Sequence, residues 1–253
     1  MKSILSGFTI FLLATIIFLY GYKNIVKTDT IKDKNLELTQ SDLNQFYKIV
    51  KIKDKVLLNI PVISQFPELA RGCEVTSLAM LLHAAGISSD KMTLAKEIKK
   101  NPTQKKYIDN KIYYGNPHEG FVGNIYTYEK PGLGVYVQPI IELAEKFLPG
   151  KIVNLTKNSF EELKVHLSDQ RPVWVIINTT YKHLPNSYFE TWYTEKGPIR
   201  VTSKEHSVLI TGFDKKYVYF NDPLTGEKNK KAPINDFEKA WVQMGSQAIT
   251  YLN

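Results

Sequence analysis

Helical patterns fill the first half of the globular part of this chain, and strand patterns fill most of the second half. Apolar residues recur at helical spacing over residues 73–85, 90–98, 139–148 and 159–167. Runs typical of strands follow at 173–178, 207–213, 217–221 and 248–252, with a hairpin over 191–202 and one more helix over 236–244. This order predicts an α+β domain, in which N-terminal helices pack on a C-terminal antiparallel sheet.

The N-terminus carries a separate signal. Residues 3–22 have no charge and are mostly apolar, and Lys2 and Lys23 flank them. Such a run is long enough to cross a hydrocarbon layer of about 30 Å. A cleaved signal peptide is the alternative, but Phe18 to Asn24 contain no small-x-small cleavage site. We therefore expect a signal-anchor over residues 1–22 in the cytoplasmic membrane, a lysine-rich stalk over 23–55 and an extracytoplasmic domain over 56–253.

Charge and cysteine content exclude several function classes. The chain has 33 Lys and Arg against 25 Asp and Glu, a net charge of +8, but only three residues are arginine: Arg71, Arg171 and Arg200. Because arginine is the usual reader of base edges, we expect a solvated basic surface and no nucleic-acid partner. A single cysteine excludes an internal disulfide framework and any site with several cysteine ligands. No metal or organic cofactor is expected.

The single cysteine, Cys73, lies where a helix is predicted to begin. Pro67 and Gly72 keep the approach non-helical. A helix N-terminus favours the thiolate and supplies N–H donors for an oxyanion, so Cys73 is a candidate nucleophile with a thiol pKa below its usual value of about 8.5. Gln65, eight residues upstream, is a candidate second oxyanion donor. An inert buried thiol is the alternative interpretation.

A thiol nucleophile needs a base, and four of the five histidines are poor candidates. His83 lies ten residues further along the same helix, which separates it from Cys73 by about 15 Å. His166 falls inside a helix, where we expect it to face solvent. His118 and His183 are predicted to lie in loops without an orienting neighbour.

His206 has a suitable partner. It opens a strand, and the next strand ends at Asp222. If the turn centres near Asp214, His206 lies opposite or diagonal to Asp222, and alternation places both side chains on one face. A carboxylate there holds the imidazole in position. A shift of one residue in register brings in Asn221 instead.

Three segments carry a family resemblance. VISQFPELARGCEVTSLAMLLHAAG and HSVLITGFDKKYVYFNDPLTG, with NPHEGFVGNIYTYEKPGLGVYVQPI between them, resemble papain-like cysteine peptidases, and most of all stand-alone members of the bacteriocin-processing (double-glycine) peptidase-like family. The resemblance covers about residues 56–253 and implies a papain-like fold with Cys73, His206, Asp222 and Gln65 in the active site. Double-glycine leader cleavage is not carried over, because the chain has no Walker A sequence and no transporter segments.

The expected function is therefore cleavage of an amide or isopeptide bond in a peptide or protein. A transglutaminase-like acyl transferase and a catalytically idle binding module of the same fold are the alternatives. Residues 107–134 are rich in tyrosine and glycine and too long for an ordinary connection. We expect this segment to border the substrate groove, and we assign substrate binding to Gly72, Tyr114, Phe121 and Tyr126.

Overall fold

The main element of the structure, a computed structural model that describes residues 51–252, is a seven-stranded sheet. Its strand order is β12-β11-β10-β7-β13-β6, with β1 paired to the far end of β10, and every pairing in it is antiparallel. The strands are β1 (Val56–Leu57), β6 (Ile152–Asn154), β7 (Val173–Asn178), β10 (Glu205–Phe213), β11 (Tyr217–Asp222), β12 (Glu227–Pro233) and β13 (Ala248–Tyr251).

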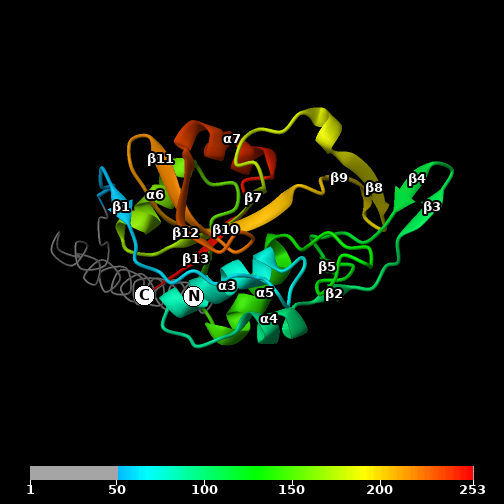
Figure 1. Cartoon of the computed structure of the whole chain (residues 1–253), viewed down its shortest axis with the longest axis horizontal. Helices are drawn as coiled ribbons and strands as arrows, with labels where there is room; N and C mark the ends of the chain where they lie inside the picture. Colours follow the sequence, from blue (N-terminus) through cyan, green and yellow to red (C-terminus); the bar gives the residue numbers. More distant parts are fainter. Residues whose placement is uncertain (1–50, 253) are drawn as a thin grey trace, which may run out of the picture. The chain divides into compact units, whose positions relative to one another are not determined.

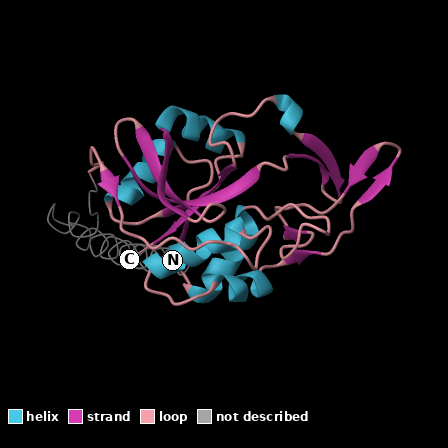
Figure 2. Ribbon diagram, viewed as in Figure 1, coloured by secondary structure: helices cyan, strands magenta, loops and turns pink. Residues whose placement is uncertain are grey.

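The two middle strands form the centre of the core. Every residue of β7 and β10 is buried, which explains why β7 is a continuous apolar run without alternation. Helices cover both faces of the sheet, α3, α4 and α5 on one side and α6 and α7 on the other (Figures 1 and 2). The helices are α3 (Cys73–Ala84), α4 (Lys91–Glu97), α5 (Val137–Phe147), α6 (Phe160–Ser168) and α7 (Ile234–Gln243).

Helix α3 is apolar on almost all sides because it lies between the sheet and the other helices. Its first ten residues are all buried, and it packs on β10 and β7 as well as on α4 and α5. Two other predicted helix starts, at residues 90 and 159, are confirmed by their caps, whereas α5 and α7 each begin two residues before the predicted position. The Asp90 side chain accepts the amides of Met92 and Thr93, and the Ser159 hydroxyl accepts the Glu162 amide. The α+β prediction is thus confirmed as a mixed structure of helices and an antiparallel sheet.

A smaller sheet extends from this core (Figure 2). Strands β3 (Lys106–Ile108) and β4 (Lys111–Tyr113) pair with the predicted hairpin, β8 (Glu190–Thr194) and β9 (Gly197–Val201), in the order β3-β4-β8-β9. Two short strands, β2 (Lys100–Asn101) and β5 (Phe121–Val122), pair in parallel beside it, and a 3-10 turn covers Asn186–Tyr188. The long aromatic segment is therefore partly strand, and Tyr114, Val122, Trp192 and Val201 form a second small core.

Other local predictions need correction. The mostly apolar stretch at 56–63 forms a strand only at Val56–Leu57, and strands β6 and β12 were not among the predicted strands. His166, expected to face solvent, is buried at the end of α6, where its ring lies 3.5 Å from a Glu162 oxygen. The chain turns back after α6, where Gln170 has a φ of 66° and the amide of Arg171 donates to the carbonyl of His166.

The predicted signal-anchor over residues 1–22 and nearly all of the stalk lie outside the described residues. Between residues 51 and 252, no helix is both long and apolar enough to cross a bilayer. The described residues belong to one compact unit, Val50–Asn253.

Candidate active site

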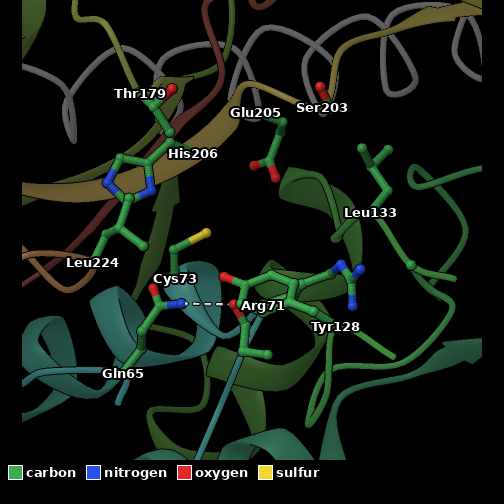
Figure 3. Close-up of a pocket in the computed structure, with 12 residues that line it drawn as sticks. Gln65, Arg71, Cys73, Tyr128, Leu133, Thr179, Ser203, Glu205, His206 and Leu224 are labelled. Carbon is green, nitrogen blue, oxygen red and sulfur yellow. Dashed lines mark hydrogen bonds between the residues drawn. The ribbon is translucent and has the colours of Figure 1, made fainter. Parts of the chain in front are cut away.

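A pocket of about 320 Å³ lies where α3 and β10 both begin (Figure 3). Three of the four predicted catalytic residues line it: Gln65, Cys73 and His206. The opposite wall comes from the loop before α5, through Tyr128 and Leu133. Residues separated by more than 130 positions in the chain are thus brought together at one opening.

The loop before α3 places the thiol. Helix α3 begins at Cys73, as predicted, and Gly72 at its N-cap provides no side-chain cap. A Cβ at position 72 would lie 2.5 Å from the Cβ of Leu69, so only glycine allows the chain to pass this close. The Cys73 side chain is largely buried but borders the pocket. Both features follow from the sequence around the cysteine.

The second side of the site is the β10–β11 hairpin. The Nε2 atom of His206 lies 2.9 Å from Oδ1 of Asp222, and both side chains are buried. Leu209 pairs with Asn221, so Asp222 lies diagonal to His206 on the neighbouring strand. The Asn221 side chain faces away and donates to the carbonyl of Ile60. The structure therefore brings Asp222, and not Asn221, to the histidine.

Asp222 is surrounded by hydrogen-bond donors. Besides His206, it accepts from the Tyr181 hydroxyl at 2.7 Å, the Lys230 ammonium at 2.9 Å and the Thr225 hydroxyl at 2.9 Å. Burial alone would raise the pKa of Asp222, but its hydrogen bonds and the positive charges of its partners outweigh burial and hold the pKa well below its usual value. Asp222 is thus a carboxylate that stays ionised and fixes the imidazole.

The thiol lies in a different electrostatic setting. Its sulfur is 3.2 Å from Oε2 of Glu74, to which it donates. Burial, the carboxyls of Glu74 and Glu205 and this hydrogen bond raise the pKa of the Cys73 thiol, against a smaller opposite effect of the Ser207 amide. This is the reverse of the lowering expected from the helix N-terminus. Burial of the thiol is the largest cause of this rise in pKa, and the two carboxyls add to it.

Neither Glu74 nor Glu205 was predicted as a site residue, although Glu74 lies within the first segment that carries the family resemblance and Glu205 directly precedes another. Each directly adjoins a predicted catalytic residue, and this adjacency, with a charged residue inside an otherwise apolar element, was the available signal. Glu74 is fully buried and accepts the Val135 amide at 2.6 Å, and burial raises the pKa of Glu74 to about 7. Burial, followed by the nearby Glu74 charge, raises the pKa of Glu205 as well.

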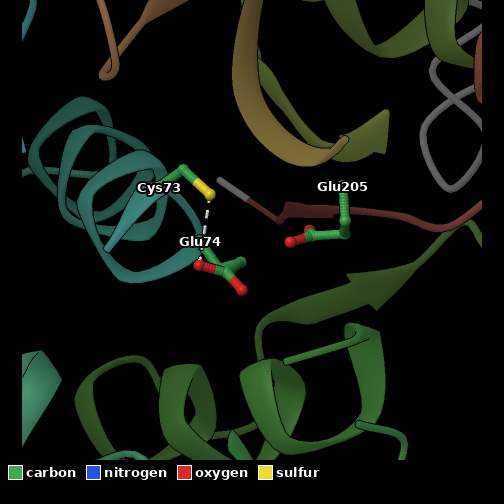
Figure 4. A group of neighbouring side chains, drawn as sticks. All are labelled: Cys73, Glu74 and Glu205. Atoms are coloured by element: carbon green, nitrogen blue, oxygen red, sulfur yellow. Dashed lines mark hydrogen bonds between the residues drawn. The ribbon is translucent and has the colours of Figure 1, made fainter. Parts of the chain in front are cut away.

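These side chains form the one trio in residues 51–252 whose donor atoms converge as metal ligands do. One atom each from Cys73, Glu74 and Glu205 lies within 4.8 Å of the others (Figure 4). Both oxygens of Glu74 are already used, by the thiol and by the Val135 amide. The trio therefore offers a metal the thiol and a single free carboxyl, fewer ligands than a structural or catalytic zinc site provides.

Gln65 lies beside the thiol, but its amide group is engaged. Its Nε2 atom donates to the carbonyls of Leu69 and Ala70, at 3.2 Å and 3.0 Å, while its Oε1 atom is buried without a partner. The Gln65 backbone amide donates to the carbonyl of Pro223, which ties this loop to the residue after Asp222. The loop before α3 and the β10–β11 hairpin are thus joined directly.

The predicted substrate residues are not the ones that line the pocket. Tyr114 is buried against Trp192, with ring centroids 4.9 Å apart, and Phe121 is in the core. Tyr126 is exposed but outside the pocket wall, and Gly72 acts through the backbone beside Cys73. The segment 107–134 does reach the pocket, through Tyr128 and the residues near Gly132. The segment 107–134 therefore contributes to the pocket wall, but through residues other than the predicted ones.

Arg71 holds this segment in place. One guanidinium nitrogen donates to the carbonyls of Asn124 and Thr127, and the group lies over the Tyr128 ring, 4.8 Å from its centroid. Because Arg71 is two residues before the thiol, the pocket wall and the nucleophile are anchored to the same loop.

Comparison with known proteins gives the same assignment over the whole domain. The sequence pattern of the Peptidase_C39 like family matches residues 57–249. The uncharacterized protein YvpB of Bacillus subtilis (strain 168) is 41% identical over 236 residues, which are 92% of this chain and 86% of YvpB. A crystal structure from Bacillus anthracis, described as a C39-like peptidase, is 50% identical with a TM-score of 0.74, and the match covers 79% of this chain and 98% of that one. With its cysteine at a helix start and its histidine held by a carboxylate on the next strand, this chain belongs to the Peptidase_C39 like family.

Proposed function

We propose that this protein is a cysteine peptidase that hydrolyses an amide or isopeptide bond with Cys73, His206 and Asp222. The observation that carries the proposal is the 2.9 Å contact between His206 Nε2 and Asp222 Oδ1, in a pocket that His206 shares with Cys73. That contact occupies one ring nitrogen and leaves the other, Nδ1, for the thiol proton. Family membership supports cysteine chemistry, and the papain-like arrangement of helix and hairpin is part of this proposal.

The reaction begins with transfer of the thiol proton to Nδ1 of His206. For this step the Cys73 side chain turns from Glu74 toward the imidazole. The thiolate attacks the substrate carbonyl, and the imidazolium, stabilised by Asp222, gives its proton to the departing amine nitrogen. Water then attacks the thioester and gives a proton to His206. The carbon–sulfur bond breaks to release the carboxylic acid, and the imidazolium returns its proton to the Cys73 sulfur. Bonds and protons balance, and no cofactor takes part in these steps.

The oxyanion is held by the amide of Cys73 at the uncapped start of α3, together with Gln65. The Gln65 side chain now donates to two carbonyls, so it has to exchange one of these bonds to reach the oxyanion. The Oε1 atom of Gln65 is buried and has no hydrogen-bond partner, so the carbonyl end of this side chain contributes no hydrogen bond to the fold. Gln65→Ala is therefore expected to slow turnover by more than the change in the free energy of unfolding accounts for.

The cellular setting is also a proposal. The uncharged run at residues 3–22 supports a single-pass anchor in the cytoplasmic membrane with the peptidase domain outside, where peptides or proteins are the substrates. The three motif segments support a place among the stand-alone relatives of the bacteriocin-processing peptidases.

The test uses the full chain in detergent with a mixed peptide library, and products are identified by mass spectrometry. Hydrolysis that disappears in Cys73→Ala and falls strongly in His206→Gln supports the proposal. Joined products between a glutamine or acyl donor and an added amine favour the transferase alternative. A Cys73 thiol that an alkylating agent modifies no faster in the wild type than in His206→Gln contradicts the assigned chemistry and leaves a binding module.

A further inference from the structure

Glu205 is a buried carboxyl that the peptidase mechanism above does not use. It is the first residue of β10, directly before His206, and its side chain points into the pocket beside the thiol (Figure 3). The residue is only 8% exposed, and its Oε1 atom is fully buried without a hydrogen-bond partner. Within residues 51–252, neither of its oxygens has a hydrogen bond or ion pair. Buried carboxyls are normally paired with a hydrogen-bond donor or a cation. Glu205 has neither among the described residues, so a ligand is a candidate for this partner.

No cation of the described structure fills that role. The Arg71 guanidinium lines the same pocket but binds the carbonyls of Asn124 and Thr127 and covers Tyr128. The charge of Lys100 lowers the pKa of the neighbouring Glu74, and its ammonium donates a hydrogen bond to the carbonyl of Ala95. Glu74 itself is satisfied by the thiol and the Val135 amide. Glu205 is left facing the pocket.

The distance from Glu205 to the thiol limits what the ligand can be. A Glu205 oxygen lies within 4.8 Å of the Cys73 sulfur (Figure 4). In an amino acid the α-nitrogen is about 2.5 Å from its own carbonyl carbon, from the standard N–Cα and Cα–C bond lengths. The separation between sulfur and carboxyl is therefore compatible with a ligand whose carbonyl lies at the sulfur and whose α-amino group contacts Glu205. The ammonium of a lysine side chain sits four carbons further out.

We propose that Glu205 binds the free α-ammonium group of the residue whose carbonyl Cys73 attacks, so that the substrate is an unblocked amino terminus. This inference rests on the proposed peptidase function and specifies its substrate class. In an empty pocket, burial raises the pKa of the Glu205 carboxyl and so favours its neutral form. An incoming ammonium supplies the counter-charge and three donors, which fits a carboxyl with both oxygens free.

The local backbone keeps this space open. Gly134 passes directly beside the two carboxyls, and a Cβ there would clash with Glu74 and lie 2.7 Å from Oε2 of Glu205. The adjoining Val135 amide ties this loop to Glu74, so that Glu205 keeps its free oxygens. A blocked terminus adds an acyl group at the α-nitrogen and removes the charge, and it offers a single neutral N–H to the same carboxyl.

The first experiment compares two electrophiles on the full chain: alanine chloromethyl ketone with a free amino group, and its N-acetyl form. Iodoacetamide gives the intrinsic thiol reactivity, and the rate of Cys73 modification is followed by mass spectrometry. We expect the free-amine reagent to react about tenfold faster or more, from the strength of a charged hydrogen bond. Glu205→Gln should bring the two rates close together. Glu129→Gln, the same change at an exposed site on the pocket loop, should leave the ratio as in the wild type.

Equal rates for the two reagents in the wild type, or a preference that persists in Glu205→Gln, overturn the inference. Equal rates indicate that an internal peptide N–H occupies the position instead. A second measurement separates this from failure of the peptidase function: binding of alanine amide and N-acetylalanine amide to Cys73→Ala by calorimetry. Glu205-dependent binding of the free amine, with a Cys73 that lacks reactivity in the wild type, supports the ammonium site and refutes only the catalytic proposal.

Discussion

Two buried carboxyls lie next to His206, and their surroundings are opposite. Asp222, on the hairpin side, accepts hydrogen bonds from His206, Tyr181 and Lys230, and its pKa is held well below the usual value. Glu205, which directly precedes His206, has no donor among the described residues, and burial raises its pKa. Burial acts in the same direction on both groups. The number and charge of the donors decide which carboxyl is ionised.

The two sides of the site therefore differ in whether their buried carboxyl has its hydrogen-bond partners within the protein. The His206–Asp222 side has its hydrogen bonds complete within the protein, as a positioning unit needs. The Cys73–Glu205 side has an unpartnered acid and a thiol whose pKa is raised, and the proposed ammonium ligand supplies the partner that Glu205 lacks. A pocket built this way favours reaction when a ligand of the right charge is bound.

The largest effect is expected from a substitution on the His206–Asp222 side of the site. Asp222→Ala removes the shared acceptor of several donors and leaves the Lys230 ammonium without its buried partner. We expect the free energy of unfolding to fall by about 3–5 kcal/mol, measured by urea denaturation. The control is Asp214→Ala, which removes a half-buried acceptor in the turn of the same hairpin. Equal losses for the two variants would show that the buried network has no special weight.

The next prediction concerns how the carboxyls beside the thiol, Glu74 and Glu205, make the stability of the protein depend on pH. A carboxyl whose folded pKa is raised holds its proton in the folded state while the unfolded chain releases it, so stability falls as pH rises through that interval. For Glu74 the interval runs from 4.5 to about 7, and Glu205 acts in the same direction. Asp222 behaves oppositely, because its contribution is present at neutral pH and is lost in acid.

Glu205→Gln tests this sign directly. Its stability relative to the wild type should rise as pH increases from 4.5, because the unfolded wild type loses a proton from Glu205 in this range and the variant has no carboxyl at this position to titrate. Urea unfolding at several pH values measures the difference, and background titration of the histidines cancels between the two proteins. A constant difference across this range would mean that Glu205 is ionised in the folded state.

A smaller effect is expected from removing one donor of Asp222. Tyr181→Phe deletes the hydroxyl that lies 2.7 Å from the carboxylate and keeps the ring that packs on Phe220. The expected loss is about 1–2 kcal/mol in unfolding free energy, the contribution of a single hydrogen bond to a charged group. Tyr188→Phe, at an exposed ring, is the matched control and should cost almost nothing. Similar values for both would place the strength of the network in the other donors.

The smallest effect concerns the pocket wall. Tyr128→Ala removes the ring under the Arg71 guanidinium, whereas Tyr126→Ala removes a neighbouring ring outside the pocket. We expect Tyr128→Ala to slow modification of Cys73 by a peptide electrophile by about threefold to tenfold, from the size of an exposed cation–π contact and the lost contact area. Iodoacetamide reactivity should stay unchanged in both variants. A larger effect for Tyr126→Ala would reverse the assignment of the wall.

Local patterns predicted the elements that carry the nucleophile and the base. The glycine before Cys73 and the apolar spacing after it place the cysteine at a helix start, and strand alternation places His206 and Asp222 on one face. The choice between Asn221 and Asp222 needed the actual strand register, in which Leu209 pairs with Asn221. Strands β6 and β12 escaped prediction because lysines and short length hide their pairing role.

By itself, the sequence determined the α+β class, the helix that begins at Cys73 and the hairpin that joins His206 to Asp222, because each depends on periodicity within a few neighbouring residues. Only the tertiary structure decided which aromatic residues line the pocket, the direction of the thiol pKa and the isolation of Glu205. These depend on contacts between Cys73, the loop near Val135 and the start of β10, which are more than 60 positions apart in the chain. Burial and charge act through such contacts in space, and no local pattern of residue types records them.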